Sequence, residues 1–276
     1  MIDRDVDFAE DYPEESRPDL RKELSHFRKF GDKWMELDML LRFTHFNANR
    51  VAAVTVEGMD PVFIVDTDNE FIVREADGTE VGRFPSRVEL PLPPPTAAPR
   101  GTFQAPLFGV TVLGSSHGFD PKGSTSGYVL WINRRGLMID PPPNSTNLLQ
   151  QEGIPPSIID GVILTHCHAD HDAGTFQKIL QEGRITLYTT QTIVGSFLRK
   201  YSALSGLGED LVRSVFKYRA VRIGEAIRVR GAEFRFFYAL HSIPCIGFEV
   251  FFGDKSMVFT GDHMNDPTKL KVRGGG

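Results

Sequence analysis

Hydrophobic and polar positions divide the chain into two parts with different patterns. In residues 19–43, large apolar side chains recur at intervals of three, four or seven positions, the spacing of an amphipathic helix, which is weakened at Gly31. Three β-branched runs separated by turn residues follow, at 51–56, 62–66 and 71–75. We therefore expect residues 19–90 to form a small α+β appendage.

A proline-rich connector at residues 91–104 separates this appendage from a second pattern. Apolar runs predict strands at 110–113, 127–132, 137–139, 162–165, 185–190, 232–240, 247–252 and 256–260, and helices at 174–182 and 192–202. Strands interleaved with helices and hairpins indicate a layered α/β domain over residues 105–276. Residues 1–18 are acidic and lack a hydrophobic period, which predicts disorder.

Composition narrows the class of protein. Apolar residues make up 41% of the chain and charged residues 24%, as in globular proteins, and the net charge of −5 argues against DNA as the main partner. No apolar stretch reaches the roughly 20 residues that a membrane helix needs, and the first residues do not have the pattern of an export signal. We expect a soluble, cytoplasmic protein whose two cysteines, Cys167 and Cys245, are reduced thiols.

The candidate chemistry begins where the apolar run at 162–165 stops. His166, His168 and Asp170 are spaced by two, so an extended backbone would turn all three toward one pocket, and His171 can approach from another side. Imidazole nitrogens and carboxylate oxygens are ligands that Zn²⁺ accepts. Solvated loop histidines are the bland alternative, but three histidines and an aspartate within six residues favour a metal site.

This His-x-His-x-Asp-His segment resembles the signature of the metallo-β-lactamase superfamily. The resemblance implies an αββα sandwich that holds two divalent metal ions, Zn²⁺ in the first place, with Mn²⁺ or Fe as alternatives. It places His166, His168 and a later His241 on the first metal, Asp170 and His171 on the second, and Asp262 between the two. Asp140 would stand behind the ligands and orient an imidazole.

The chain departs from the family pattern near its end. The family supplies a last histidine to the second metal on a further strand, yet only fourteen residues follow Asp262. His263 lies directly beside Asp262, which does not fit that position. We therefore expect a sandwich that lacks its C-terminal strand and helix and has an incomplete second metal subsite.

Further segments resemble one branch of the superfamily more closely. Residues 112–116, 124–130 and 241–248 resemble the phosphodiesterase branch that includes the tRNA 3′-processing endonucleases. Residues 140–146, 164–178 and 232–237 resemble the metallo-β-lactamase domain of eukaryotic microbial cGMP phosphodiesterases. This resemblance implies a small-molecule nucleotide substrate, hydrolysis of 3′,5′-cyclic nucleotides (cGMP or cAMP), and regulatory cyclic-nucleotide-binding domains outside this chain as partners.

A loop rich in glycine and serine precedes the motif and would lie near the pocket mouth. Its candidate phosphate-binding residues are Ser115, Ser116, Ser124 and Thr125, whose hydroxyl or backbone N–H groups can hold phosphate oxygens. His117 on the same loop could protonate the leaving ribose oxygen, although a histidine facing water is the simpler interpretation. Asp170 and His117 are thus the candidate catalytic groups.

Three other functions are compatible with the sequence. A tRNA 3′-processing endonuclease would need a basic gripping arm, and the scattered cations Lys200, Arg213, Lys217, Arg219 and Arg222 are more typical of a solvated face. A hydrolase of thioesters or lactones would use the same metal motif. A non-catalytic remnant of the fold is favoured by the missing C-terminal ligand.

Overall fold

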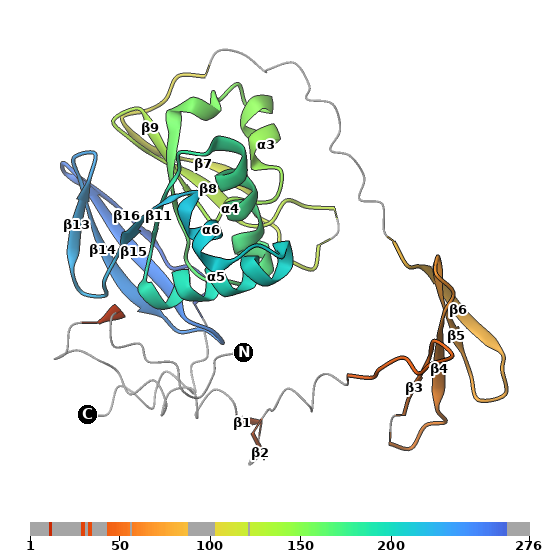
Figure 1. Ribbon diagram of the computed structural model, residues 1–276. Helices are drawn as coiled ribbons and strands as arrows, with labels where there is room; N and C mark the ends of the chain where they lie inside the picture. Colours follow the sequence, from red (N-terminus) through yellow and green to blue (C-terminus); the bar gives the residue numbers. More distant parts are fainter. Residues whose placement is uncertain are drawn as a thin grey trace. The chain divides into compact units, whose positions relative to one another are not determined.

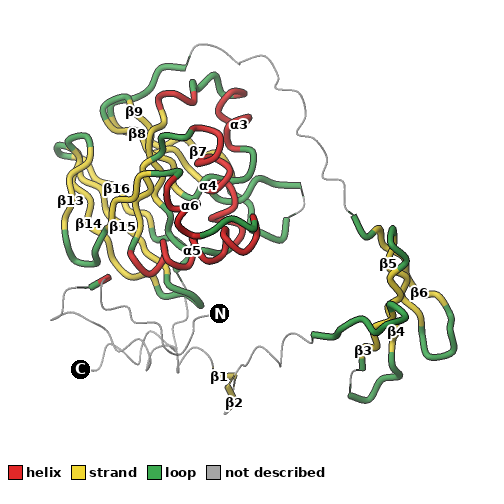
Figure 2. The backbone as a smooth tube through the Cα atoms, viewed as in Figure 1, coloured by secondary structure: helices red, strands yellow, loops and turns green. Residues whose placement is uncertain are grey.

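The computed structural model describes residues 11–12, 29–30, 33–34, 43–55, 57–87, 103–120 and 122–263. The chain divides into two compact units, one formed by residues 28–94 and the other by residues 1–27 together with 95–276 (Figure 1). Figure 2 shows the distribution of helices and strands along both units. In the described part of the chain, no helix combines the length and apolar character needed to cross a bilayer.

The described part of the smaller unit consists of strands. Strands β3 (Val51–Val54), β4 (Val62–Asp66), β5 (Glu70–Arg74) and β6 (Glu80–Pro85) form an antiparallel sheet in sequence order. Ala52 and Ile72 are its buried residues, at 1% and 7% exposure. Three of these strands coincide with the β-branched runs that the sequence predicted. The sequence did not predict β6, because it contains only two large apolar residues.

The helix predicted at residues 19–43 is wrong where the structure describes this segment. Lys29–Phe30 (β1) pairs antiparallel with Lys33–Trp34 (β2), and most of the remaining predicted helix lies outside the described residues. Gly31 already weakened the predicted helix in the sequence, because glycine is a poor helix former. The described residues of the smaller unit show strands and no helix, and the α+β mixture expected for residues 19–90 stays a prediction.

In the larger unit, a six-stranded sheet forms the central layer. Its strand order is β12-β11-β10-β9-β8-β7. The strands are β7 (Phe108–Gly114), β8 (Gly127–Ile132), β9 (Arg135–Ile139), β10 (Ile159–Ile163), β11 (Thr186–Thr189) and β12 (Lys217–Ala220). Strands β9 to β12 run parallel, so their carboxyl ends meet at one edge of the sheet.

A four-stranded antiparallel sheet packs against the first sheet. It consists of β13 (Ala226–Val229), β14 (Ala232–Ala239), β15 (Cys245–Phe252) and β16 (Lys255–Phe259). Alternate side chains of β14 and β15, among them Phe234, Phe236 and Phe248, are buried in the common core. Ring contacts such as Phe108 with Phe252, at 5.5 Å between centroids, join the two sheets.

Helices cover the other face of the six-stranded sheet (Figures 1 and 2). They are α3 (Ser145–Gln151), a short 3₁₀ turn at Pro156–Ile158, α4 (Ala169–Glu182), α5 (Gln191–Ser205) and α6 (Glu209–Ser214). The layered α/β class predicted from the sequence is therefore confirmed, with helix, sheet and sheet layers described. The expectation that a closing strand and helix are missing concerns the chain beyond residue 263. That part lies outside the described residues, so the expectation stays a prediction.

Two residues of the N-terminal segment for which disorder was predicted, Asp11 and Tyr12, are described and are buried; the prediction for the rest of residues 1–18 lies outside the described residues. Asp11 and Tyr12 are 3% and 7% exposed. Asp11 Oδ1 accepts a hydrogen bond from the backbone N–H of Thr192 in the first turn of α5, at 3.0 Å, and its carbonyl accepts one from Ile223 at 2.9 Å. An acidic side chain at a helix N-terminus is stabilised by the unpaired N–H groups there, a role that composition alone does not show.

Candidate metal centre

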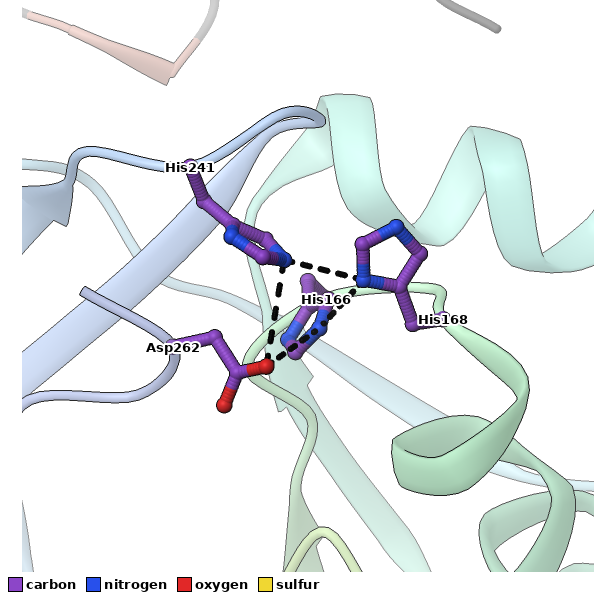
Figure 3. Close-up of side chains that lie close together, drawn as sticks. All are labelled: His166, His168, His241 and Asp262. Atoms are coloured by element: carbon purple, nitrogen blue, oxygen red, sulfur yellow. Dashed lines mark hydrogen bonds and ion pairs between the residues drawn. The ribbon is translucent and has the colours of Figure 1, made fainter. Parts of the chain in front are cut away.

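Three segments of the chain bring the candidate ligands to one edge of the two sheets. His166 follows the end of β10, and His168 is the last residue before α4. His241 follows β14, and Asp262 follows β16. Figure 3 shows these four side chains pointing toward one another from both sheets. His168 and His241 are thus in direct contact, although they are 73 positions apart in the sequence.

The first group of donor atoms encloses a space the size of a metal ion. His168 Nδ1 lies 3.1 Å from His166 Nε2 and 2.9 Å from His241 Nε2. Asp262 Oδ2 lies 3.8 Å and 3.9 Å from the Nε2 atoms of His166 and His241. A tetrahedral zinc ion with ligands at about 2.0–2.2 Å separates neighbouring donors by about 3.3–3.6 Å. The donor types and spacings therefore fit a divalent metal ion.

A second group of donors begins at the other oxygen of Asp262. Asp262 Oδ1 lies 3.4 Å from His171 Nε2, and Asp170 Oδ2 lies 3.7 Å from the same nitrogen. Asp262 thus presents one oxygen to each group of donors. The structure brings together all six residues that the sequence predicted as ligands: His166, His168, Asp170, His171, His241 and Asp262.

Asp140, His166 and His171 also lie close enough together to hold an ion, but the bonds of Asp140 give it another role. Its Oδ1 accepts from the backbone N–H of Thr165 at 2.8 Å. Its Oδ2 accepts from the Thr165 hydroxyl at 2.5 Å and lies 2.9 Å from His171 Nδ1. Both carboxylate oxygens are thus engaged with the chain, as the resemblance of Asp140 to an orienting aspartate implied. The contact with Thr165 is one that the sequence did not predict.

Charges at the centre are unbalanced in a way that favours a bound cation. Burial, together with the neighbouring histidines His171 and His241, lowers the pKa of His166 to about 2. Burial likewise lowers the pKa of His168 and of His241. Burial also acts to lower the pKa of His171, but its hydrogen bonds to Asp140 and Asp262 outweigh this and raise it to about 10. A proton on His171 therefore offsets only part of the negative charge of the carboxylates in the metal-free protein.

The pKa of Asp262 is shifted in the direction opposite to that of its partner His171. Its hydrogen bond with His171 outweighs desolvation and lowers the pKa of the Asp262 carboxyl to about 2. The carboxylate is therefore ionised throughout the neutral range, as a metal ligand must be.

The first turn of α4 is held in place by an ion pair between a buried carboxylate and a partly exposed lysine. Asp172 is fully buried, and both of its oxygens lie 2.7 Å from Lys200 Nζ on α5. Tyr201 donates a further bond to Asp172 at 2.9 Å, and Lys200 also donates to the carbonyl of Cys167 at 3.2 Å. Lys200, which the sequence assigned to a solvated face, instead ties the His166–His168 segment to two helices.

The serine-rich loop packs against the second group of donors. A Cβ atom on Gly118 would lie 2.8 Å from Oδ2 of Asp170, so the backbone of this loop passes directly beside that carboxylate. His117 is exposed, and its Nδ1 accepts from the N–H of Phe119 at 3.1 Å. The backbone of the loop, and not the His117 ring, is therefore the part in contact with the donors.

Of the predicted phosphate-binding residues, Ser116 and Ser124 are hydrogen-bonded within the loop, whereas the buried Thr125 hydroxyl has no hydrogen-bond partner among the described residues. Ser116 and Thr125 form an isolated bridge, and the N–H of Ser116 donates to the carbonyl of Ser124 at 3.0 Å. The Ser116 hydroxyl also hydrogen-bonds Asp120 and lowers the pKa of that carboxyl, after the larger effect of the Lys122 N–H. Ser115 is exposed at the start of the loop. Within the described residues, no hydrogen bond joins these side chains to the histidine cluster.

Three remaining candidates have structural contacts. His263 is exposed, and its Nδ1 accepts from the N–H of Leu240, so it holds the end of β14 and lies outside the donor groups. Cys245 is buried, with Sγ 3.7 Å from His166 Nδ1, and burial raises its pKa to about 12. Burial also raises the pKa of Cys167, whose Sγ contacts the carbonyl of Ile193.

Comparison with characterised proteins supports the resemblance seen in the sequence. The chain is 45% identical over 278 aligned positions to the cGMP-dependent 3′,5′-cGMP phosphodiesterase A of Dictyostelium discoideum. This alignment covers 96% of this chain and 31% of that protein. It is 44% identical over 171 positions to the cAMP/cGMP-dependent 3′,5′-cAMP/cGMP phosphodiesterase B of the same organism, covering 61% of this chain and 16% of that protein. The chain thus spans about a third or less of the length of these relatives.

Solved structures show a weaker likeness. The metallo-β-lactamase fold protein YhfI from Bacillus subtilis has a TM-score of 0.46 and 22% identity, over 59% of this chain and 65% of that one. The short form of human tRNase Z has a TM-score of 0.45 and 17% identity, over 59% and 73%. Residues 108–274, more than half of the chain, match the family model described as anti-Pycsar protein Apyc1. The chain therefore belongs to that family.

Proposed function

We propose that this chain is a metal-dependent phosphodiesterase that hydrolyses 3′,5′-cyclic nucleotides. The observation that carries the proposal is the pair of adjacent donor groups that share Asp262, with Oδ2 toward His166 and Oδ1 toward His171. Two cations a few ångströms apart suit the in-line displacement of a phosphodiester, because they face both the attacking and the leaving oxygen. The names of the two Dictyostelium relatives support the same substrate class.

The proposed metal content is two divalent ions, zinc in the first place. His166, His168 and His241 with one oxygen of Asp262 would hold the first, and Asp170 and His171 with the other oxygen would hold the second. Bound ions of this kind supply a nucleophilic water at neutral pH and positive charge for the phosphoryl oxygens. The mixed nitrogen and oxygen donors also suit Mn²⁺ or Fe²⁺.

The chain's own residues would orient the reactants. Asp170 is partly exposed beside the Gly118 backbone, so its carboxylate can accept a hydrogen bond from the attacking water while it faces His171. His117, on the same loop, is our candidate for protonating the leaving ribose oxygen. The hydrogen bonds of Asp140 keep Nε2 of His171 turned toward the second group of donors.

The relatives' names also suggest regulation. Both are described as dependent on the cyclic nucleotides cGMP or cAMP. Since this chain spans only about a third of the first relative, we propose that cyclic-nucleotide-binding domains outside it act as partners of the catalytic part.

The test is a substrate panel with matched variants. Purified, zinc-loaded protein is assayed on cGMP, cAMP, bis-p-nitrophenyl phosphate and a tRNA precursor. We expect turnover of a cyclic nucleotide, its loss in His168→Ala, and its retention in His45→Ala, which removes an exposed histidine of the smaller unit. Cleavage of the tRNA precursor alone would replace the proposed substrate, and turnover that survives His168→Ala would exclude this site as the catalyst.

A further inference from the structure

Thr165 lies between two ligand groups without belonging to either. It follows β10, is 1% exposed, and precedes His166. Its backbone N–H and its hydroxyl both donate to Asp140, at 2.8 and 2.5 Å. The same hydroxyl oxygen lies 2.9 Å from Nδ1 of His166. One threonine side chain thus touches a buried carboxylate and a metal-facing imidazole at once.

The direction of each hydrogen bond follows from the donors available. A hydroxyl has one hydrogen, and the carboxylate of Asp140 can only accept, so the Thr165 hydrogen points to Asp140. The Thr165 oxygen is then left to accept from Nδ1–H of His166. A neutral imidazole with its hydrogen on Nδ1 has its lone pair on Nε2, the atom that faces His168 and Asp262.

The same reasoning applies on the other side of Asp140. Its Oδ2 also accepts from Nδ1–H of His171, which leaves Nε2 of His171 directed toward Asp262 and Asp170. A continuous chain therefore runs from His166 through Thr165 and Asp140 to His171. Its two ends lie in different donor groups.

We propose that Thr165 is a positioning residue that couples the two metal subsites by linking His166 to the carboxylate that also orients His171. The inference rests on the proposed metal site and deepens it. Hydrogen bonds from behind fix the tautomer and the ring orientation of a ligating histidine, and their loss typically weakens metal binding about 10–100-fold. Asp140 is hydrogen-bonded directly to His171, but it is linked to His166 only through the Thr165 hydroxyl.

A purely structural role is the competing explanation, because Thr165 also anchors the end of β10. Thr189 provides a matched control for that role. It ends the adjacent parallel strand β11, is fully buried, and donates its hydroxyl hydrogen to the carbonyl of Leu164 at 2.8 Å. Thr189→Val therefore removes a comparable buried hydrogen bond at a neighbouring strand end, with no ligand histidine involved.

The experiment measures zinc affinity by competition with a chelator, using metal-free protein whose folding is checked by thermal unfolding. We expect Thr165→Val to weaken zinc binding about 10–100-fold, Thr165→Ser to keep wild-type affinity, and Thr189→Val to lower thermal stability without changing affinity. In an Asp140→Ala background, Thr165→Val should have a smaller effect than in the wild-type protein, because the Thr165 hydroxyl beside His166 is then no longer held by Asp140.

Each contrary result has a distinct meaning. Wild-type zinc affinity in folded Thr165→Val overturns the inference. An equal loss of zinc affinity in Thr189→Val also overturns it. So does a double variant in which the losses of affinity caused by Thr165→Val and by Asp140→Ala simply multiply. If Asp140→Ala does not fold, the comparison of Thr165→Val with Thr165→Ser and Thr189→Val decides alone. Failure of the wild-type protein to bind zinc would instead overturn the proposed metal site.

Discussion

Asp140 Oδ2 lies 2.9 Å from Nδ1 of His171, across 31 positions of sequence and at the meeting point of β9 and the first turn of α4. Both residues are buried, at 4% and 5% exposure. The contact keeps the other ring nitrogen of His171 directed toward Asp262 and gives the buried carboxylate a hydrogen-bond donor. The arrangement of the second donor group therefore depends on a residue that is not itself among the proposed ligands.

Removal of this carboxylate should weaken the metal centre. We expect Asp140→Ala to lower zinc affinity about 10–100-fold, because His171 loses its orienting partner and Thr165 loses its acceptor. Asp160→Ala is the control, since Asp160 is 44% exposed and pairs with Arg135 and Arg230, away from the histidines. Chelator competition on both variants decides, and equal affinities would contradict this account of Asp140.

The charge state of His171 should be visible by NMR in metal-free protein. Because the pKa of His171 is raised to about 10, its ring should remain protonated at pH 8, whereas the ring of His166, with its pKa lowered to about 2, should be neutral. A metal ion must displace the His171 proton, so zinc affinity should increase as pH rises toward 10.

Asp140→Asn supplies the control for that charge state. It removes a negative partner of His171, so the pKa of His171 should fall. A neutral His171 ring at pH 8 in the wild-type protein would show that the carboxylates do not outweigh burial.

A side chain at position 118 should disturb Asp170. The added methyl group of Gly118→Ala would lie 2.8 Å from Cβ, Cγ and Oδ2 of Asp170, so the loop or the carboxylate must shift. We expect kcat to fall by up to about 100-fold, as for other small displacements of reacting groups. Gly195→Ala is the control, because its methyl group would meet only the end of Arg199, at 3.4 Å. An unchanged kcat in Gly118→Ala would separate the loop from the reaction.

A buried lysine outside the site should make stability depend on pH. Lys178 is fully buried, its Nζ lies 2.9 Å from Glu182, and burial lowers its pKa below the usual 10.5. At alkaline pH below 10.5, Lys178 is therefore protonated more fully in the unfolded chain than in the folded one. The free-energy cost of burying the charged Lys178 side chain accordingly decreases as pH rises.

Lys178→Met should accordingly raise the free energy of unfolding by about 1–2 kcal/mol at pH 7. The gain should shrink as pH approaches 10.5. Urea unfolding at both pH values measures it, with Lys217→Met, at an exposed lysine, as the control. A loss of stability at pH 7 would mean that the pair with Glu182 outweighs the desolvation of Lys178.

Much of the site could be predicted because its local part is contiguous. His166, His168, Asp170 and His171 lie within six residues, and the family pattern then pointed to His241 and Asp262. The extended backbone assumed for the motif is wrong at Asp170, because α4 begins at Ala169. The sequence hides this start, since the residue before the helix is His168, whose side chain makes no capping hydrogen bond.

The supporting contacts could not be predicted, because they depend on how separate elements pack. Lys200 meets Asp172 only because α5 lies beside α4, and a cation in a polar helix stretch looks the same whether exposed or paired. Strand β12, Lys217–Ala220, has no apolar run because it forms the edge of the sheet. Strands with a clear apolar run, such as β8 at Gly127–Ile132, matched their predicted limits.

Anomalous diffraction at the zinc edge, from zinc-loaded crystals, tests most directly whether donors from three separated segments enclose a divalent ion. We expect a peak at about 2.0–2.2 Å from Nε2 of His166, Nδ1 of His168 and Nε2 of His241, with Asp262 as the fourth ligand. Zinc-saturated crystals with no peak there, or with zinc held by other residues, would contradict this metal centre.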